Sequence, residues 1–163
     1  MVLTIVATLV AGAAGFYMLR SFVKNRKQKK KQLALANAYH NLIIQHRAIV
    51  EHSEIIGDMV VALDRRNKKL LVIDYAGKKQ VENCITLLCI GDTRIVEEKN
   101  SEGNTSRVLL ELRRKRTGEA WFICFFDEKL DTIHDLSLRM KKVSYWKTRV
   151  DMARYGGVES QKS

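Results

Sequence analysis

The chain has 163 residues, which is enough for one small domain and an extra segment but not for two domains of ordinary size. Its net charge is +11, and subtracting the seven cations between Arg20 and Lys31 leaves only +4 on the rest. This distribution disfavours nucleic-acid binding, which needs cations clustered on a folded face. Three cysteines without a CxxC pair favour a reducing compartment over a disulfide-stapled scaffold.

Residues 1–19 are the most apolar stretch of the chain. The eighteen apolar or small residues from Val2 to Leu19 would extend roughly 27 Å as a helix, close to the ~30 Å hydrocarbon core of a bilayer. We therefore predict a transmembrane helix at residues 1–19. A cleaved signal peptide, favoured by the small residues Ala11-Gly12-Ala13, and a buried helix of a globular domain are the alternatives.

A basic collar, residues 20–32, follows this stretch. Its charged residues are all cations, namely Arg20, Lys24, Arg26, Lys27, Lys29, Lys30 and Lys31. Because cations accumulate on the cytosolic side of a membrane helix, the collar predicts a single-pass protein of the cell membrane with its N-terminus outside and its C-terminal domain in the cytosol. The collar also attracts anionic headgroups, so membrane lipids are the first predicted partner.

Residues 33–57 have a helical pattern. Apolar side chains recur at spacings of three and four between Leu35 and Ile56, which predicts an amphipathic helix that ends at Gly57. Its apolar stripe would pack on the following domain or form a weak homo-oligomer.

Beyond Gly57 the chain becomes rich in β-branched residues that alternate with polar ones. Six strands are predicted, at residues 59–66, 69–75, 80–90, 93–98, 106–115 and 119–126. A helix over 127–154 follows, and residues 156–163 are predicted to be a disordered tail. Residues 58–155 are thus predicted to be an α+β domain, an antiparallel sheet or small barrel capped by a C-terminal helix.

This order of meander strands and a long terminal helix resembles the pleckstrin-homology-like superfold of small bacterial proteins. The resemblance covers residues 58–154 and rests on the strand order, the hairpin from Val60 to Asp74 and the terminal helix. It implies seven strands and a binding or scaffolding module without catalytic machinery. Some members of the superfold bind lipid headgroups or peptides, and phosphoinositides commonly bind at the first hairpin. A lipocalin-like or other α+β arrangement is the alternative.

Two of the predicted hairpin tips are rich in cations. The tips that follow the first and the fifth strand of a meander lie at the same end of the sheet, so the two clusters would share a pole. The candidate anion-binding residues are Arg65, Arg66, Lys68, Lys69, Arg113, Arg114, Lys115 and Arg116. This pole would meet anionic lipid or an acidic protein partner, although turn cations are ordinarily only solvated.

An acidic cluster lies at the start of the predicted terminal helix. Asp127, Asp131, His134 and Asp135 would share one helical face, where they could hold a hard cation or act as an acid–base pair. Acids at a helix N-terminus need no such purpose, because the helix dipole stabilises them. We therefore predict no metal, cofactor or catalytic residue, and favour a non-catalytic binding or scaffolding protein. A small membrane-tethered enzyme that uses the acidic face and a nucleic-acid-binding protein that uses the hairpin tips are the alternatives.

Overall fold

The computed structural model describes residues 30–75 and 81–156. The chain divides into two compact units, Met1–Ala38 and Tyr39–Ser163. A helix is described over residues 30–46, and its first part belongs to the first unit. The second unit contains all the described strands and the long C-terminal helix, and it carries the candidate site.

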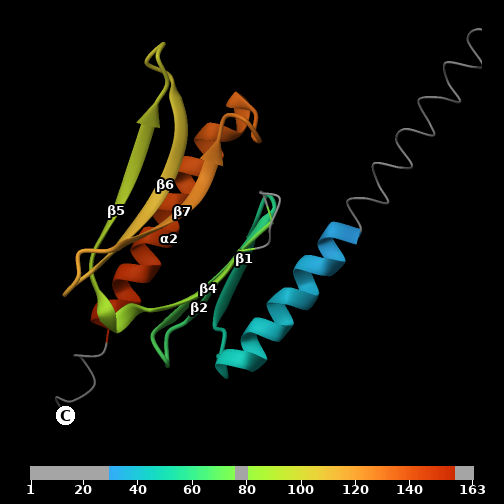
Figure 1. Cartoon of the computed structure of the whole chain (residues 1–163), viewed down its shortest axis with the longest axis vertical. Coiled ribbons are helices and arrows are strands. Elements are labelled where there is room, and N and C mark those ends of the chain that lie inside the picture. Colours follow the sequence, from blue (N-terminus) through green and yellow to red (C-terminus); the bar gives the residue numbers. More distant parts are fainter. Residues whose placement is uncertain (1–29, 76–80, 157–163) are drawn as a thin grey trace, which may run out of the picture. The chain divides into compact units, whose positions relative to one another are not determined.

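Seven antiparallel strands are described, and they form two sheets. The elements are β1 (His52–Ile56), β2 (Met59–Asp64), β3 (Lys69–Asp74), β4 (Val81–Thr86), η1 (Leu87–Cys89), β5 (Ile90–Lys99), β6 (Thr105–Arg114), β7 (Ala120–Asp127), η2 (Ile133–Asp135) and α2 (Leu136–Tyr155). The four-stranded sheet has the order β1-β2-β3-β4 and the three-stranded sheet the order β5-β6-β7 (Figure 1). Described strands therefore pair only with their neighbours along the chain.

The hydrophobic core is built from the inward faces of both sheets and from α2. Side chains alternate between the two faces of a strand, so Val61 and Leu63 of β2 meet Leu110 and Leu112 of β6 in this core. Trp146 of α2 completes it, and all five side chains have an exposed fraction of 0%. Burial of such large apolar side chains is the main term that stabilises the domain.

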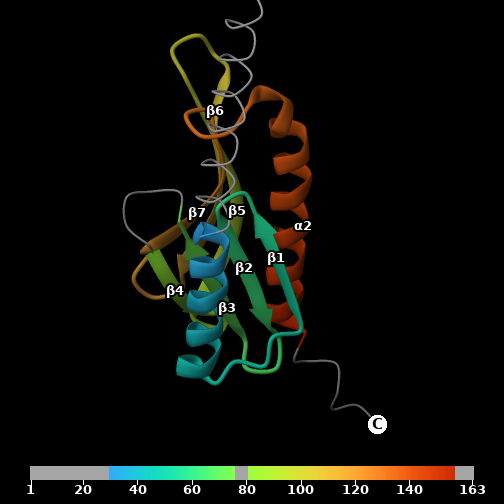
Figure 2. The same ribbon diagram turned by 90° about the vertical axis from the view of Figure 1, so that its right-hand side faces the viewer.

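Helix α2 is fastened to the edge strand β1 by polar contacts. Glu54 accepts a hydrogen bond from the Trp146 indole at 2.8 Å and forms an ion pair with Lys142 at 2.7 Å. Although partial burial alone would raise the pKa of Glu54, the hydrogen bonds from Lys142 and Trp146 lower it. Figure 2 shows β1 lying beside α2, and these contacts fix that arrangement.

The two sheets are joined at η1, where the chain leaves the first sheet and enters the second. The Leu87 amide donates to the Lys68 carbonyl at 2.7 Å, and the Lys115 amide donates to the Cys89 carbonyl at 2.9 Å. Gly91 permits this close approach, because a Cβ at residue 91 would lie 3.2 Å from the Cα of Lys115. The η1 segment therefore forms backbone hydrogen bonds to both the β2–β3 turn and the β6–β7 turn.

Glu111 gives the three-stranded sheet a pH-dependent contribution to stability. Its buried carboxylate accepts from Arg94 at 2.6 Å and from Arg113 at 2.7 Å. Hydrogen bonds from Arg94 and then Arg113 lower the pKa of Glu111. A carboxyl whose pKa is lowered by folding stabilises the protein above its unfolded pKa, and this stabilisation disappears as the pH falls through the folded pKa.

We therefore expect the Glu111→Gln variant to be less stable than the wild type at pH 7 and to approach it in acid. Urea unfolding at a series of pH values measures this, and the difference in midpoint should shrink below the ordinary glutamate pKa of about 4.3. A difference that stays constant between pH 7 and pH 3 would show that the Glu111 charge contributes nothing.

The predicted architecture is wrong in two respects. Within residues 30–75 and 81–156, no helix combines the length and the apolar character needed to span a bilayer, since α2 carries charged side chains along its whole length. The structure therefore contradicts the predicted transmembrane architecture and the predicted single-pass location in the cell membrane. The predicted span itself, residues 1–19, lies outside the described residues. The strands also form two sheets instead of one sheet or barrel.

Several element boundaries also differ from the predictions. The amphipathic helix ends at residue 46, because Arg47 adopts a left-handed backbone with φ of 47°, and His52–Ile56 forms β1 instead of helix. Gly91 and Asp92, predicted as a turn, lie inside β5 at a register shift. The terminal helix begins at Leu136, nine residues later than predicted.

Candidate functional site: a basic pole beside the sheet junction

The two cation-rich turns lie at one end of the second unit. The β2–β3 turn contacts η1 through the Lys68 carbonyl, and the β6–β7 turn contacts η1 through the Lys115 amide. The C-terminal end of α2 reaches the same place, since the Arg154 side chain donates to the Gly91 carbonyl at 2.6 Å. In Figure 1 these segments meet at the lower end of the domain.

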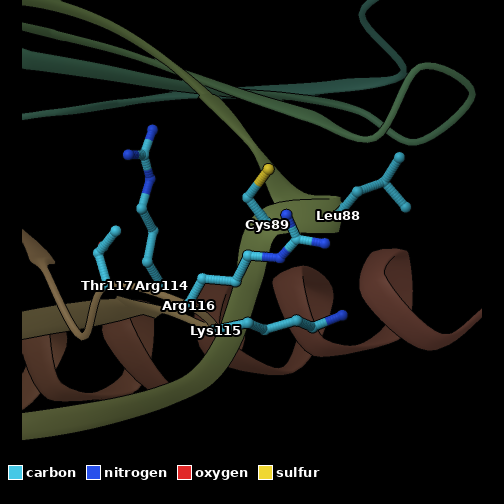
Figure 3. A pocket seen from close by; sticks show the side chains of 6 residues that line it. All are labelled: Leu88, Cys89, Arg114, Lys115, Arg116 and Thr117. Atoms are coloured by element: carbon cyan, nitrogen blue, oxygen red, sulfur yellow. The ribbon is translucent and has the colours of Figure 1, made fainter.

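A cavity of about 590 Å³ opens between η1 and the β6–β7 turn. It is lined by Leu88, Cys89, Arg114, Lys115, Arg116 and Thr117. Figure 3 shows the Arg116 side chain extending toward Cys89 and Leu88, while Arg114 runs to a separate part of the cavity. The Leu88 side chain is 59% exposed, so the cavity offers an apolar group beside its cations.

Two cations of the second turn are already held by neighbouring side chains. Arg113 pairs with Glu111. Arg114 pairs with Glu119 at 3.2 Å and stacks over the Trp121 ring at 4.8 Å. These contacts give both guanidinium groups an acidic partner next to the cavity, although Arg113 shares Glu111 with Arg94.

The cations of the β2–β3 turn also differ in whether they contact neighbouring segments. Lys68 donates to the Arg154 carbonyl at 3.3 Å, and Lys69 donates to the His46 carbonyl at 2.8 Å. Both ammonium groups therefore tie the turn to neighbouring segments. Arg65 and Arg66 instead line a second cavity of about 330 Å³ beside the end of α2.

Four of the eight predicted candidates are thus exposed cations that form no ion pair within residues 30–75 and 81–156. They are Arg65, Arg66, Lys115 and Arg116, and we call them, together with η1, the basic pole. Guanidinium groups bind phosphate and carboxylate in a bidentate manner, and lysine adds a mobile point charge. This arrangement can bind an anion.

The hairpin that the pleckstrin-homology-like resemblance implies as the ligand site is different in this chain. The first described hairpin is β1–β2, and its two-residue turn consists of Gly57 and Asp58. The turn carries no cation, and because strands are antiparallel it lies at the opposite end from the β2–β3 turn. The cations of the pole therefore belong to other turns than the resemblance implies.

The predicted acidic face of the terminal helix is not formed. Asp127 is the last residue of β7, and Asp131 lies before α2 and pairs with Arg139 at 2.8 Å. Asp135 closes a capping box with Thr132, and these hydrogen bonds lower the pKa of its carboxyl group. No group of three or more potential metal ligands occurs in the part of the chain that the structure describes. The three aspartates are thus structural contacts of the β7–α2 connection, and His134 lies in η2.

Most of the basic collar cannot be placed. Lys30 and Lys31 lie in the described helix of the first unit, and the other five collar cations fall outside the described residues. Their predicted contact with a membrane surface stays a prediction.

Comparison with known proteins gives no relative: no protein-family model, curated protein or solved structure matches the chain. The site must therefore be interpreted from its own geometry. Sequence reasoning identified the turn cations but missed Leu88 and Cys89, which also line the larger cavity. Residues 80–90 were predicted as one strand, whereas the structure ends β4 at Thr86 and places buried Leu87 and exposed Leu88 in η1.

Proposed function

We propose that this protein is a non-catalytic binding module that holds a ligand of dense negative charge at the basic pole. The observation that carries the proposal is the contrast within one turn. Arg113 and Arg114 form ion pairs with Glu111 and Glu119, whereas Lys115 and Arg116 line a cavity and form no ion pair in the described residues. Unpaired cations around a cavity attract anions and raise their local concentration.

The size of the cavity suggests that the ligand is more than a simple ion. A volume of about 590 Å³ lies within the range of roughly 300 to 1,000 Å³ that is common for small-molecule sites. The exposed Leu88 side chain provides an apolar contact next to the cations. A phosphate cluster or a carboxylate cluster attached to an apolar group meets both requirements.

The pleckstrin-homology-like class is also a proposal, supported by the chain order of seven strands followed by one helix. The proposed ligand site does not depend on that class, since its cations lie on the β2–β3 and β6–β7 turns. The same binding role would hold for another α+β class with this pole.

The test is a titration of the full-length protein with two probes, inositol hexakisphosphate and a hexa-aspartate peptide. Trp121 lies under Arg114, next to the cavity, so its fluorescence should report binding. The double variant Lys115→Glu/Arg116→Glu should weaken binding of the preferred probe by about tenfold or more, since a charge reversal at each contact costs over 1.4 kcal/mol in total.

The matched control is Lys99→Glu/Lys129→Glu, which changes the net charge equally at exposed positions outside the cavity. If both double variants weaken binding to the same extent, the effect is one of overall charge and the proposed site is wrong. Binding of neither probe by the wild type at low salt would also reject it. The probe that binds more tightly distinguishes a phosphate ligand from a carboxylate ligand.

The exposed Cys89 provides a second measurement that needs no ligand. Burial raises the pKa of Cys84 and Cys124, so these two thiols should react slowly. Iodoacetate is an anion and iodoacetamide is neutral; the ratio of their rates at Cys89, determined by mass spectrometry, should fall in Lys115→Glu/Arg116→Glu. An unchanged ratio would mean that the two cations create no positive potential in the cavity.

A further inference from the structure

The strand β1 is an open edge of the four-stranded sheet. Among the described residues it pairs only with β2, in a register that places Ile56 opposite Met59 and Glu54 opposite Val61. In an antiparallel pair, residues alternate between bonding to the partner strand and facing away from it. Because the turn has two residues, the residues that flank it, Ile56 and Met59, exchange backbone hydrogen bonds, and so do Glu54 and Val61 two positions further on. The backbone N–H and C=O groups of Ser53 and Ile55 therefore face the open edge.

A groove runs along this edge and is walled by α2. Its cavity of about 460 Å³ is lined by His52, Ser53 and Glu54 on one side and by Lys141, Lys142 and Tyr145 on the other. Contacts between the two walls keep it in place. The Tyr145 hydroxyl lies 3.0 Å from Nε2 of His52, and Glu54 holds both Lys142 and Trp146. The groove is therefore preorganised between two ordered elements.

The charges in the groove define what it can accept. Lys142 is neutralised by Glu54, whereas Lys141 is exposed and forms no ion pair within the described ranges 30–75 and 81–156. Tyr145, four residues further along α2, is 40% exposed, and the Arg149 guanidinium stacks over its ring at 4.7 Å from the centroid. The groove lining thus presents the exposed cation Lys141 and the partly exposed ring of Tyr145, one helical turn apart.

This spacing matches an extended peptide. Four residues of helix rise by about 6 Å, and two residues of a strand span about 6.6 Å. Side chains at positions i and i+2 of a strand share a face, so an acidic side chain at one position would meet Lys141 and an apolar one at the other would meet Tyr145. The backbone of the residue between them would pair with Ser53.

The direction of the peptide also follows from the contacts. His52 lies next to Tyr145 and Glu54 next to Lys142, so α2 runs antiparallel to β1. Every pair in this sheet is antiparallel, and a fifth strand added in the same manner would run parallel to α2. Its acidic residue would then precede its apolar residue.

We propose that the β1–α2 groove binds an extended segment of a partner protein as a fifth strand, with the pattern acidic residue, any residue, aromatic or aliphatic residue. The main-chain bonds to the edge strand supply affinity, and Lys141 and Tyr145 supply selectivity. This second surface is independent of the basic pole, because none of its lining residues is shared with the cavity at η1.

The test uses a fluorescein-labelled peptide, Thr-Val-Glu-Thr-Tyr-Val-Thr, and fluorescence anisotropy with the full-length protein. Lys141→Glu should weaken binding by about tenfold, the size of a lost and reversed charge contact, and a peptide with Lys in place of Glu should regain affinity for that variant. Lys129→Glu, an exposed lysine outside the groove, is the matched control and should have no effect.

The backbone contact is tested separately. Ser53→Pro removes an outward-facing amide that the sheet does not use, which edge strands tolerate, and should abolish binding, whereas Ser53→Val keeps the amide and should retain it. Methylation of the central Thr amide of the peptide probes the same bond without altering the protein, and a peptide with Glu and Tyr exchanged probes the direction.

Failure of the wild type to bind the peptide at about millimolar concentration would overturn the proposal, because it would place any affinity below roughly 4 kcal/mol. Equal binding by Lys141→Glu, by Ser53→Pro or by the methylated peptide would overturn it as well. Sedimentation analysis tests the other possible occupant, a second copy of this chain. If the wild type is a dimer, the Ser53→Pro variant is a monomer and the wild type binds no peptide, then the edge strand pairs with a second copy and the proposal of a partner segment is wrong.

Discussion

Replacement of Trp146 by alanine is expected to cost about 3 to 5 kcal/mol in the free energy of unfolding, as for other large buried aromatic residues. The side chain is fully buried at the centre of the core, and its indole N–H donates to Glu54. Small domains are stable by only about 5 to 15 kcal/mol, so the variant should be close to unfolding at room temperature. Urea denaturation followed by circular dichroism measures the loss.

Trp146→Phe separates packing from hydrogen bonding. It keeps most of the buried ring but leaves Glu54 without the indole donor, and a lost hydrogen bond to a charged group costs about 1.5 to 3 kcal/mol. We therefore expect Trp146→Phe to lower the free energy of unfolding, but by less than Trp146→Ala. A Trp146→Ala variant with the wild-type urea midpoint would contradict the position of Trp146 in the core.

The second large effect is expected at Asp64. Its fully buried carboxylate accepts hydrogen bonds from the Ile49 amide at 2.8 Å and from the backbone and side-chain nitrogens of Asn67 at 2.8 and 2.7 Å. Asp64→Ala would leave these donors without partners, at a cost of about 2 to 4 kcal/mol. Glu102→Ala, in an exposed loop, is the control and should be nearly neutral.

The Asp64 variant should also weaken the basic pole. Asp64 fixes the turn that carries Arg65 and Arg66, so a loosened turn should reduce binding of inositol hexakisphosphate even where the protein remains folded. Burial alone would raise the pKa of Asp64, but the hydrogen bonds from Asn67 and Ile49 lower it. The stabilisation is therefore present above the ordinary aspartate pKa and is lost as the pH falls through the folded value. An Asp64→Ala variant with unchanged midpoint at pH 7 would contradict both expectations.

Local sequence patterns predicted the hairpins because each contains its own signal. The strands 59–66 and 69–75 were expected from alternating apolar residues around a polar tip, and β2 and β3 agree closely with them. β1 was missed because five residues that alternate can also be placed on a helix, and only its pairing with β2 decides between the two. The division into two sheets depends on η1, a tertiary feature that periodicity does not encode.

The candidate site could likewise be predicted only in part from the sequence. The sequence places eight cations at two turns, and meander order places those turns at one end. It does not indicate that Lys68 and Lys69 bind carbonyl groups or that Arg113 and Arg114 pair with glutamates, because these partners lie on other segments or depend on side-chain geometry. The distinction between paired and unpaired cations is therefore what the structure adds.

The pairing of each strand with its neighbour also has a kinetic consequence. Residues 52–86 and 90–127 each make a complete sheet from a continuous stretch of chain, so both have low contact order and can form early in folding. The Trp146–Glu54 bond instead joins residues 92 apart, and its loop closure is entropically more costly. We therefore expect α2 to dock late. While residue 136 is still inside the ribosome, the inward faces of both sheets would be uncovered.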